Sequence, residues 1–154
     1  MNKINESGKV TFGQAWKDFW VGYFDFKGTS TRAGFWWGAL IYAICNFVVG
    51  FIKGFIRGFM ASMGMVPNTT VIMAIYYVLL VIVTIPILAA AARHFRDEGL
   101  KDGVIIALVI AYVALQILLA LQPAILWLAF IFNVVMIVLL CMPTGKFSNS
   151  SKEM

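Results

Sequence analysis

Charged residues divide this chain into long apolar runs separated by short polar segments. Arg57 and Arg93 enclose a stretch without any charged residue, and Asp102 and Lys146 enclose a second, longer one. An α-helix rises about 1.5 Å per residue and the hydrocarbon core of a bilayer is about 30 Å thick, so a span needs roughly 20 apolar residues. The pattern therefore predicts an all-α, polytopic membrane protein.

The apolar runs predict four transmembrane helices. The first two occupy residues 35–52 and 71–92. As a single helix, the longer uncharged stretch would measure about 65 Å, twice the thickness of the core, so we expect it to fold back on itself. Leu121-Gln122-Pro123 provides the turn, because proline cannot continue the helix before it but is tolerated where the next one starts. The resulting spans are residues 104–121 and 124–142.

The distribution of basic residues predicts the orientation. With four spans, both chain ends lie on one side, and that side collects ten of the 12 Lys and Arg residues. Cytoplasmic loops carry the excess of basic residues, so both termini are expected in the cytoplasm. We expect one membrane domain, residues 12–145, between polar tails at residues 1–11 and 146–154.

Residues 12–24 predict one more helix, which does not cross the membrane. Its aromatic residues recur at helical spacing along one face: Phe12, Trp16, Phe19, Trp20 and Tyr23. Tryptophan and tyrosine favour the headgroup layer, which suggests an amphipathic helix on the inner leaflet. Packing of the same aromatic side chains against the spans of this chain is an equally good interpretation.

Composition supports the membrane assignment. Of the 154 residues, 62% are hydrophobic and 12% charged, with a mean hydropathy of +0.89. Soluble domains are about half apolar and about one quarter charged. The net charge of +5 suits either nucleic acid or an anionic membrane surface. Because the charges lie at the ends of apolar runs, we expect contact with membrane lipids and no nucleic-acid binding.

A ridge of small residues begins at the end of the first span and continues beyond it. Gly50, Gly54 and Gly58 form two successive G-x-x-x-G steps, with Lys53 and Arg57 on a neighbouring stripe. Small residues at this spacing let helices approach closely in lipid. We expect the ridge to pack within the chain, against a second copy or against a partner membrane protein.

Polar residues inside the spans are costly in lipid and therefore informative. Asn46, Gln116 and Asn133 all fall at a depth of roughly 14–18 Å from their entry sides, near the midplane. They are expected to bond one another across helices. No ionisable group accompanies them, which disfavours ion-coupled transport. Pro86 is expected to free a carbonyl of its helix, with Thr84 as the donor that satisfies it.

The loop after the second span, residues 93–103, is the densest cluster of charge and contains the one histidine, His94. Its arginines, Arg93 and Arg96, have the forked donors that bind lipid phosphates, and Asp97 is a candidate partner for either. The loop has no nearby nucleophile and no metal-ligand spacing. We therefore expect no catalytic residue, no metal site and no cofactor.

Two sequence motifs resemble those of a known family. Tyr23-Phe24-Asp25-Phe26-Lys27-Gly28, followed by Ser30, Arg32 and Phe35-Trp36-Trp37, resembles the opening signature of the bacterial "domain of unknown function 805" membrane proteins. Their second signature resembles Ile85-Pro86 followed by Arg93-His94-Phe95-Arg96-Asp97-Glu98-Gly99-Leu100. The tail Gly145-Lys146-Phe147-Ser148-Asn149 is also similar. The resemblance implies a small protein of the bacterial cytoplasmic membrane and implies no activity.

Both motifs lie on the predicted cytoplasmic side, so we expect the first to fold against the loop after the second span. This would gather Lys27, Arg32, Arg93 and Arg96 at one inner-leaflet surface, with Asp25 and Asp97 as counter-charges. The leading hypothesis is a non-enzymatic protein that binds a partner protein or anionic lipid there. The alternative is a small channel, exporter or peptide-immunity factor that uses the glycine ridge and the midplane amides. An enzyme acting on lipid is disfavoured.

Overall fold

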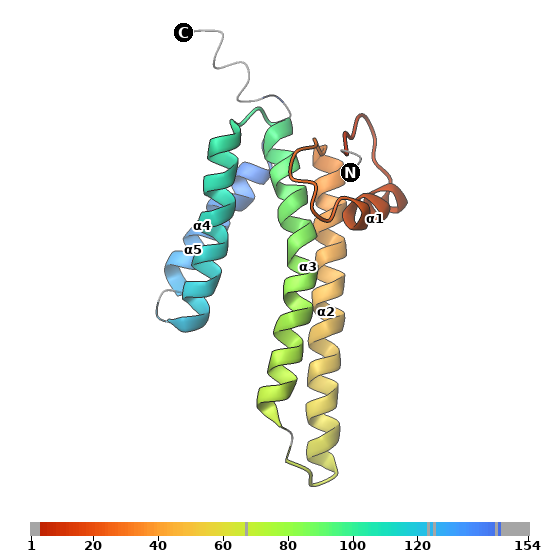
Figure 1. Cartoon of the computed structure of the whole chain (residues 1–154), viewed down its shortest axis with the longest axis vertical. Coiled ribbons are helices and arrows are strands. Elements are labelled where there is room, and N and C mark those ends of the chain that lie inside the picture. Colours follow the sequence, from red (N-terminus) through yellow and green to blue (C-terminus); the bar gives the residue numbers. More distant parts are fainter. Residues whose placement is uncertain (1–3, 67, 123, 125, 144, 146–154) are drawn as a thin grey trace.

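Five helices account for most of the chain. The structure, a computed structural model, describes residues 4–66, 68–122, 124, 126–143 and 145. The helices are α1 (Phe12–Val21), α2 (Arg32–Ser62), α3 (Thr69–Asp97), α4 (Asp102–Leu121) and α5 (Leu126–Leu140). Helices α2 and α3 form a long hairpin, and α4 and α5 form a shorter one that meets it near one end and diverges farther along (Figure 1). The predicted helical architecture is confirmed.

Local sequence sets where these helices begin and end. The side chains of Thr11, Thr31 and Asn68 each accept a bond from a backbone N–H in the first turn of the helix that follows. Two helices end at glycines with positive φ, Gly64 after α2 and Gly99 after α3. In both, the residue after the glycine donates its N–H to a carbonyl five residues earlier, as in a Schellman motif.

The long hairpin extends beyond the predicted spans. Helix α2 has 31 residues and α3 has 29, or about 46 and 44 Å of helix. Charge ended the predicted span at residue 52, but a charged side chain does not stop a helix. Helix α2 runs through Lys53 and Arg57 until Gly64 allows the left-handed turn. The Lys53 ammonium lies 3.7 Å from the centre of the Tyr76 ring on α3, a cation–π contact.

The buried core lies at one end of the molecule, which we call the polar end: residues 4–31, the adjoining ends of α2, α3 and α5, and the α3–α4 turn. Phe35, Phe95, Ile105 and Met136 join α2, α3, α4 and α5 there. The small side chains Ala89 to Ala92 of α3 are all buried and allow the other helices to approach. Tertiary packing therefore holds the helices together mainly at this end.

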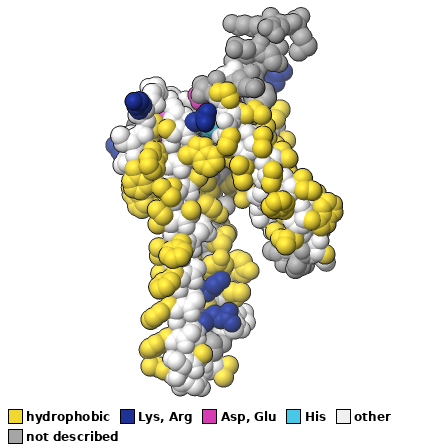
Figure 2. Space-filling view, turned by 180° about the vertical axis from the view of Figure 1, so that it is seen from behind, with side chains coloured by type: hydrophobic (Ala, Val, Ile, Leu, Met, Phe, Trp, Pro, Cys, Tyr) yellow, Lys and Arg dark blue, Asp and Glu magenta, His cyan; other side chains and the backbone are white. Residues whose placement is uncertain are grey.

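Away from the polar end, large apolar side chains are exposed along both hairpins (Figure 2). A soluble protein of this size rarely leaves such extensive apolar surface to water, whereas lipid covers it at no cost. Helices α2, α3 and α4 are long and apolar enough to cross a membrane; α5 is apolar but has 15 residues. The molecule is a membrane protein with at least these three candidate spans.

Helix α1 buries part of its aromatic face against the chain and leaves part of it exposed. Ala15 and Phe19 are buried against Ile41 of α2 and Val83 of α3, so this part of the face packs on the chain itself. Trp16 and Trp20 remain exposed. The helix ends at Val21, three residues earlier than predicted. Gly22 caps it by donating its N–H to the Asp18 carbonyl, and a Cβ at Gly22 would overlap the side chains of Ile4 and Arg93.

The glycine ridge of α2 has no partner within the described part of the chain. A Cβ added at Gly50, Gly54 or Gly58 would meet no atom within 4 Å. Beside the ridge, Phe47, Phe51, Phe55 and Phe59 form a ladder of stacked rings with centroids 6.0–6.3 Å apart. Packing of the ridge inside this chain, the first of the three expectations, is therefore not observed.

Pro86 frees a carbonyl in α3, as predicted, but the predicted donor is wrong. A proline at position 86 has no N–H for the Ile82 carbonyl oxygen. The Tyr23 hydroxyl, from the first motif, donates to this oxygen at 2.6 Å. The Thr84 hydroxyl instead donates to Leu80. Tyr23 thus fastens the segment after α1 to the proline site of α3.

We predict that Tyr23→Phe lowers the free energy of unfolding in detergent micelles by about 1 kcal/mol, because it leaves the Ile82 carbonyl without a donor. In a Pro86→Ala background, position 86 supplies its own N–H, so the same substitution should cost much less. Tyr77→Phe, at an exposed tyrosine of α3, is the matched control. An equal cost of Tyr23→Phe in both backgrounds would contradict this account.

Candidate functional site

The two motifs are in direct contact at the polar end, as predicted. The turn that precedes α2, residues 22–30, lies on the last turns of α3. The backbone N–H of Ser30 donates to the Arg93 carbonyl at 3.3 Å. Arg93, His94 and Arg96 each reach a carbonyl oxygen in this turn. The second motif therefore holds the first in place mainly through side-chain bonds to backbone.

Arg93 is the buried centre of this contact. Arg93 is only 1% exposed, and its Nη1 donates to the carbonyls of Gly22 and Asp25 at 3.0 and 3.1 Å. A buried cation is costly unless compensated. The carboxylates of Asp25, Glu6 and Asp18 supply that compensation electrostatically. Arg93 is thus not exposed to lipid or to a partner, contrary to its predicted place on a surface.

Asp25 organises the first motif. Its carboxylate accepts backbone N–H groups from Ile4, Lys27 and Gly28 at 2.6–3.2 Å. Burial alone would raise the pKa of Asp25, but these N–H donors and the nearby Arg93 charge hold that pKa below its usual value of 3.8. Asp25 is therefore ionised at neutral pH, and its negative charge stabilises both the N–H groups of the turn and the Arg93 cation.

The N-terminal segment, predicted as a polar tail, is part of the site from Ile4 onward. Asn5 and Thr29 form a parallel β-bridge, and the Glu6 carboxylate accepts bonds from Ser30 and Thr31. An added Cβ at Gly28 would overlap the Ile4 carbonyl, so this motif position requires glycine. Residues 1–3 and the predicted tail at 146–154 lie outside the described residues.

His94 connects three segments. Its Nδ1 lies 3.2 Å from the Ser30 carbonyl oxygen and its Nε2 lies 3.1 Å from that of Leu140, at the end of α5. The ring stacks on Phe35 of α2, with centroids 5.2 Å apart. Carbonyl oxygens only accept, so a ring nitrogen that carries hydrogen donates to the carbonyl it faces. His94 is wholly buried and acts here as a bridge between α2, α3 and α5.

Glu98 is a buried carboxyl group beside this bridge. Its Oε1 lies 3.4 Å from His94 Nε2, and neither carboxylate oxygen has a hydrogen-bond partner among the residues that the structure describes. Burial and the Asp97 charge raise the pKa of Glu98 to about 7, with Arg32 opposing the rise. Glu98 therefore changes protonation near neutral pH.

Arg96 is held between the first motif and α4. Its Nη1 donates to the carbonyls of Phe26 and Gly28, and its Nε and Nη2 both donate to Asp102 Oδ1 at 2.9 and 2.7 Å. The Arg96 side chain is 24% exposed and that of Asp102 72%. The ion pair therefore lies at the surface, where a soluble or lipid ligand has access to it.

The five predicted binding residues thus have different positions. Lys27 and Arg32 are exposed, Arg96 is partly exposed and Arg93 is buried. Asp97 is partly buried, and its carbonyl accepts the N–H of Gly145. Four acids that contribute to the site were not predicted as site residues: Glu6, Asp18, Glu98 and Asp102. For Glu6, its isolation among uncharged neighbours was the available signal.

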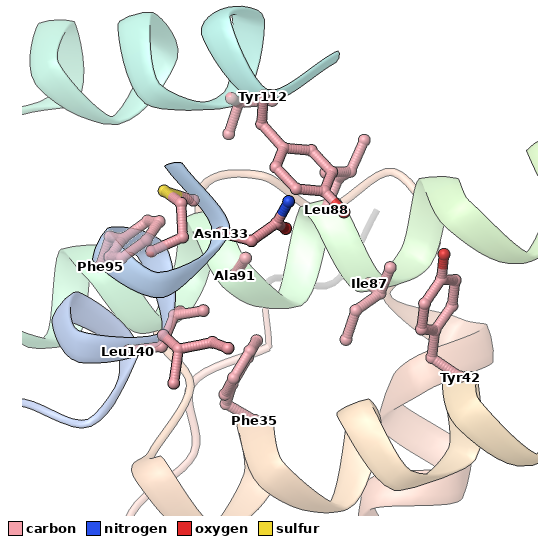
Figure 3. Close-up of a pocket in the computed structure, with 12 residues that line it drawn as sticks. Phe35, Tyr42, Ile87, Leu88, Ala91, Phe95, Tyr112, Asn133 and Leu140 are labelled. Atoms are coloured by element: carbon pink, nitrogen blue, oxygen red, sulfur yellow. The ribbon is translucent and has the colours of Figure 1, made fainter. Parts of the chain in front are cut away.

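The three midplane amides do not bond one another, contrary to prediction. Asn46 and Asn133 each donate to a carbonyl of their own helix, and Gln116 lies beside Tyr112. A cavity of about 140 Å³ lies among α2, α3, α4 and α5. In Figure 3, Asn133 points toward Tyr112, while Tyr42 lies to one side among apolar residues. Phe35 and Phe95 are among the apolar residues that line it, so its walls are mostly nonpolar.

The side chains of Ser30 and His94 are both engaged in other contacts. The Ser30 hydroxyl donates to Glu6, and both nitrogens of His94 face carbonyl oxygens, so these two residues do not form a nucleophile–base pair. Across the part of the chain that the structure describes, no three His, Cys, Asp or Glu side chains are grouped to hold a metal ion. The site combines the exposed cations Lys27 and Arg32 with a hydrogen-bonded, partly buried scaffold.

We predict that Glu98 makes stability pH-dependent. Between its ordinary pKa of 4.5 and its folded pKa of about 7, the folded protein keeps a proton that the unfolded chain has released, so the free energy of unfolding falls as pH rises. Glu98→Gln should remove this fall and be more stable than the wild type above pH 7 by roughly 2–3 kcal/mol. Thermal unfolding in micelles from pH 5 to 8.5 measures the difference. Asp102→Asn, at an exposed acid, should retain the fall in the free energy of unfolding with rising pH. Parallel pH profiles for the wild type and Glu98→Gln would refute the assignment of this fall to Glu98.

Comparison with known proteins gives a family but no described function. No curated protein and no solved structure showed significant similarity to the chain. Residues 23–150 match the family described as "Protein of unknown function (DUF805)". The match includes the first motif, the second motif and all four helices α2 to α5. The chain therefore belongs to the DUF805 family.

Proposed function

We propose that this protein is a non-enzymatic, four-span protein of the bacterial cytoplasmic membrane that binds anionic lipid at its cytoplasmic surface. The polar end faces the cytoplasm, and α2 to α5 each cross the bilayer. The observation that carries the proposal is that the basic residues of the polar end are partly buried and partly exposed. Arg93 is used inside the fold, while Lys27 and Arg32 stay exposed next to exposed aromatic side chains.

Two features support an even number of crossings. Ile4 bonds to Asp25 and Gly145 bonds to Asp97, so the two ends of the described chain lie at the same end of the helices. Helix α5 is short, about 22 Å, but it lies beside α4 and returns the chain to the polar end (Figure 1). The excess of basic residues at that end favours the cytoplasm.

The surface of the polar end suits the headgroup layer. Trp16, Trp20 and Trp37 are exposed there, and Phe12 packs edge-on against Trp37 with ring centroids 5.6 Å apart. Aromatic residues with this exposure favour the membrane interface. Figure 2 shows basic side chains at this end as well as others toward the far end of the long hairpin, and each basic residue near an anionic leaflet contributes about 1 kcal/mol. Aromatic anchoring places these cations beside lipid phosphates.

The channel or exporter alternative receives less support. Its polar residues bond within their own helices, and the cavity between the spans is lined mainly by apolar side chains. Neither arrangement provides a continuous polar path for an ion. The open glycine ridge is compatible with a second copy or a partner membrane protein, and it does not distinguish the two functions.

We predict the topology from accessibility of single cysteines in a Cys45→Ala, Cys141→Ala background. A membrane-impermeant maleimide added to intact cells should label Val66→Cys and Gln122→Cys, at the ends of the two hairpins. It should label Lys101→Cys, in the α3–α4 turn, only after the membrane is opened. Labelling of Lys101→Cys in intact cells, or protection of Gln122→Cys, would overturn the proposed topology.

We predict that lipid co-purifying with the protein is enriched in phosphatidylglycerol over phosphatidylcholine when both are supplied in equal amounts. Lys27→Gln with Arg32→Gln should reduce the enrichment several-fold, because two exposed charges are lost. Lys53→Gln with Arg57→Gln removes the same amount of charge from the other end of α2 and should leave the phosphatidylglycerol enrichment unchanged. No enrichment in the wild type, or equal losses in both variants, would refute the proposed function.

A further inference from the structure

A groove between α3 and α4 joins charged and apolar surfaces. It has a volume of about 240 Å³ and lies beside the first motif. Phe26, Lys27, Arg96 and Asp102 line its polar end, and Ile106 and Ile110 extend its wall along α4. A phospholipid has a matching arrangement along its length, with a charged headgroup at one end followed by an apolar chain. The groove therefore matches one lipid rather than a soluble anion alone.

The polar end of the groove has donors available for a phosphate. Lys27 is exposed, and Arg96 keeps one N–H on Nη2 beyond the bond to Asp102. No side chain caps the start of α4; Val104 and Ile105 donate to the Lys101 carbonyl, while the N–H groups of Asp102 and Gly103 have no acceptor among the described residues. A Cβ added at Gly103 would meet nothing within 4 Å, so the space around the first turn of α4 is open at this residue. Free N–H groups at a helix start favour an anion.

Asp102 occupies the place that a phosphate oxygen would take. Its Oδ1 accepts from both Nε and Nη2 of Arg96, the fork with which arginine binds carboxylate or phosphate. Its side chain is 72% exposed, so it can turn away into solvent. Asp102 therefore competes with an incoming anion and also lowers the net charge of the groove to that of one cation.

We propose that this groove is a specific site for one anionic phospholipid, whose phosphate displaces Asp102 from the Arg96 fork while an acyl chain lies along Ile106 and Ile110. The site rests on the proposed lipid-binding function and refines it. Lys27 and the start of α4 bind the remaining phosphate oxygens. A headgroup that carries an additional cation is disfavoured by Lys27 and Arg96, which gives selectivity for net negative lipids.

The test is native mass spectrometry of the protein in micelles titrated with phosphatidylglycerol or phosphatidylcholine. Asp102→Asn removes the competitor and should raise the affinity for phosphatidylglycerol about fivefold, the effect of one interfacial charge. Asp102→Glu keeps the charge and should bind like the wild type. Ile106→Trp fills the apolar wall and should lower the affinity several-fold, whereas Leu118→Trp, at an exposed site farther along α4, should not.

The outcomes separate this site from the general function. Preference for phosphatidylglycerol that depends on Lys27 and Arg32 but is unchanged by Asp102→Asn and Ile106→Trp would overturn the groove alone. Absence of any preference would overturn both proposals. Inorganic phosphate should not displace the lipid, because it lacks the chain; displacement at equal concentration would show a site for a free anion and overturn the lipid assignment.

Discussion

The buried guanidinium of Arg93 is the interaction on which the polar end depends. It bonds the carbonyls of Gly22 and Asp25, and its charge is compensated by Asp25, Glu6 and Asp18. Removing one partner of a buried ion pair leaves an uncompensated charge at a cost of several kcal/mol. The turn before α2 and the N-terminal segment are thus coupled to α3, because both supply groups to the single cation that α3 carries.

This coupling explains why the protein has an ordered core at one end while lipid-facing helices make up the rest. Between apolar helices in lipid there is no hydrophobic driving force, so association relies on packing and on hydrogen bonds. Here the small residues Ala89 to Ala92 provide the packing, and His94 bonds α3 to Ser30 and Leu140. Farther along, the hairpins diverge, and the Gly50–Gly58 ridge remains open.

Apolar runs and turn residues were enough to predict the helices and the hairpin at Gln122, because the need to satisfy backbone groups in lipid leaves few alternatives to helix. The contact between the motifs was predicted too, since topology placed both on one side. The roles of individual residues were harder. Arg93 and Arg96 are equivalent by composition, and only their positions along α3 decide that one enters the core. Tyr23 replaced Thr84 as donor at Pro86 because a tertiary contact, invisible in local spacing, supplied it.

The separation of Arg93 from Arg96 also bears on function. Three residues along a helix correspond to about 300° of rotation and about 4.5 Å of rise, so the two side chains leave α3 only about 60° apart and differ mainly in their distance from the end of the helix. Both side chains reach carbonyls of the first motif, but Arg93 is buried there, whereas Arg96 lies at the rim of the polar end and also pairs with the exposed Asp102 carboxylate. Loss of Arg93 would dismantle the scaffold, and loss of Asp102 would only free a donor. Substitutions at the rim are therefore the ones that report on ligand binding, because they change the affinity without removing the frame that positions the site.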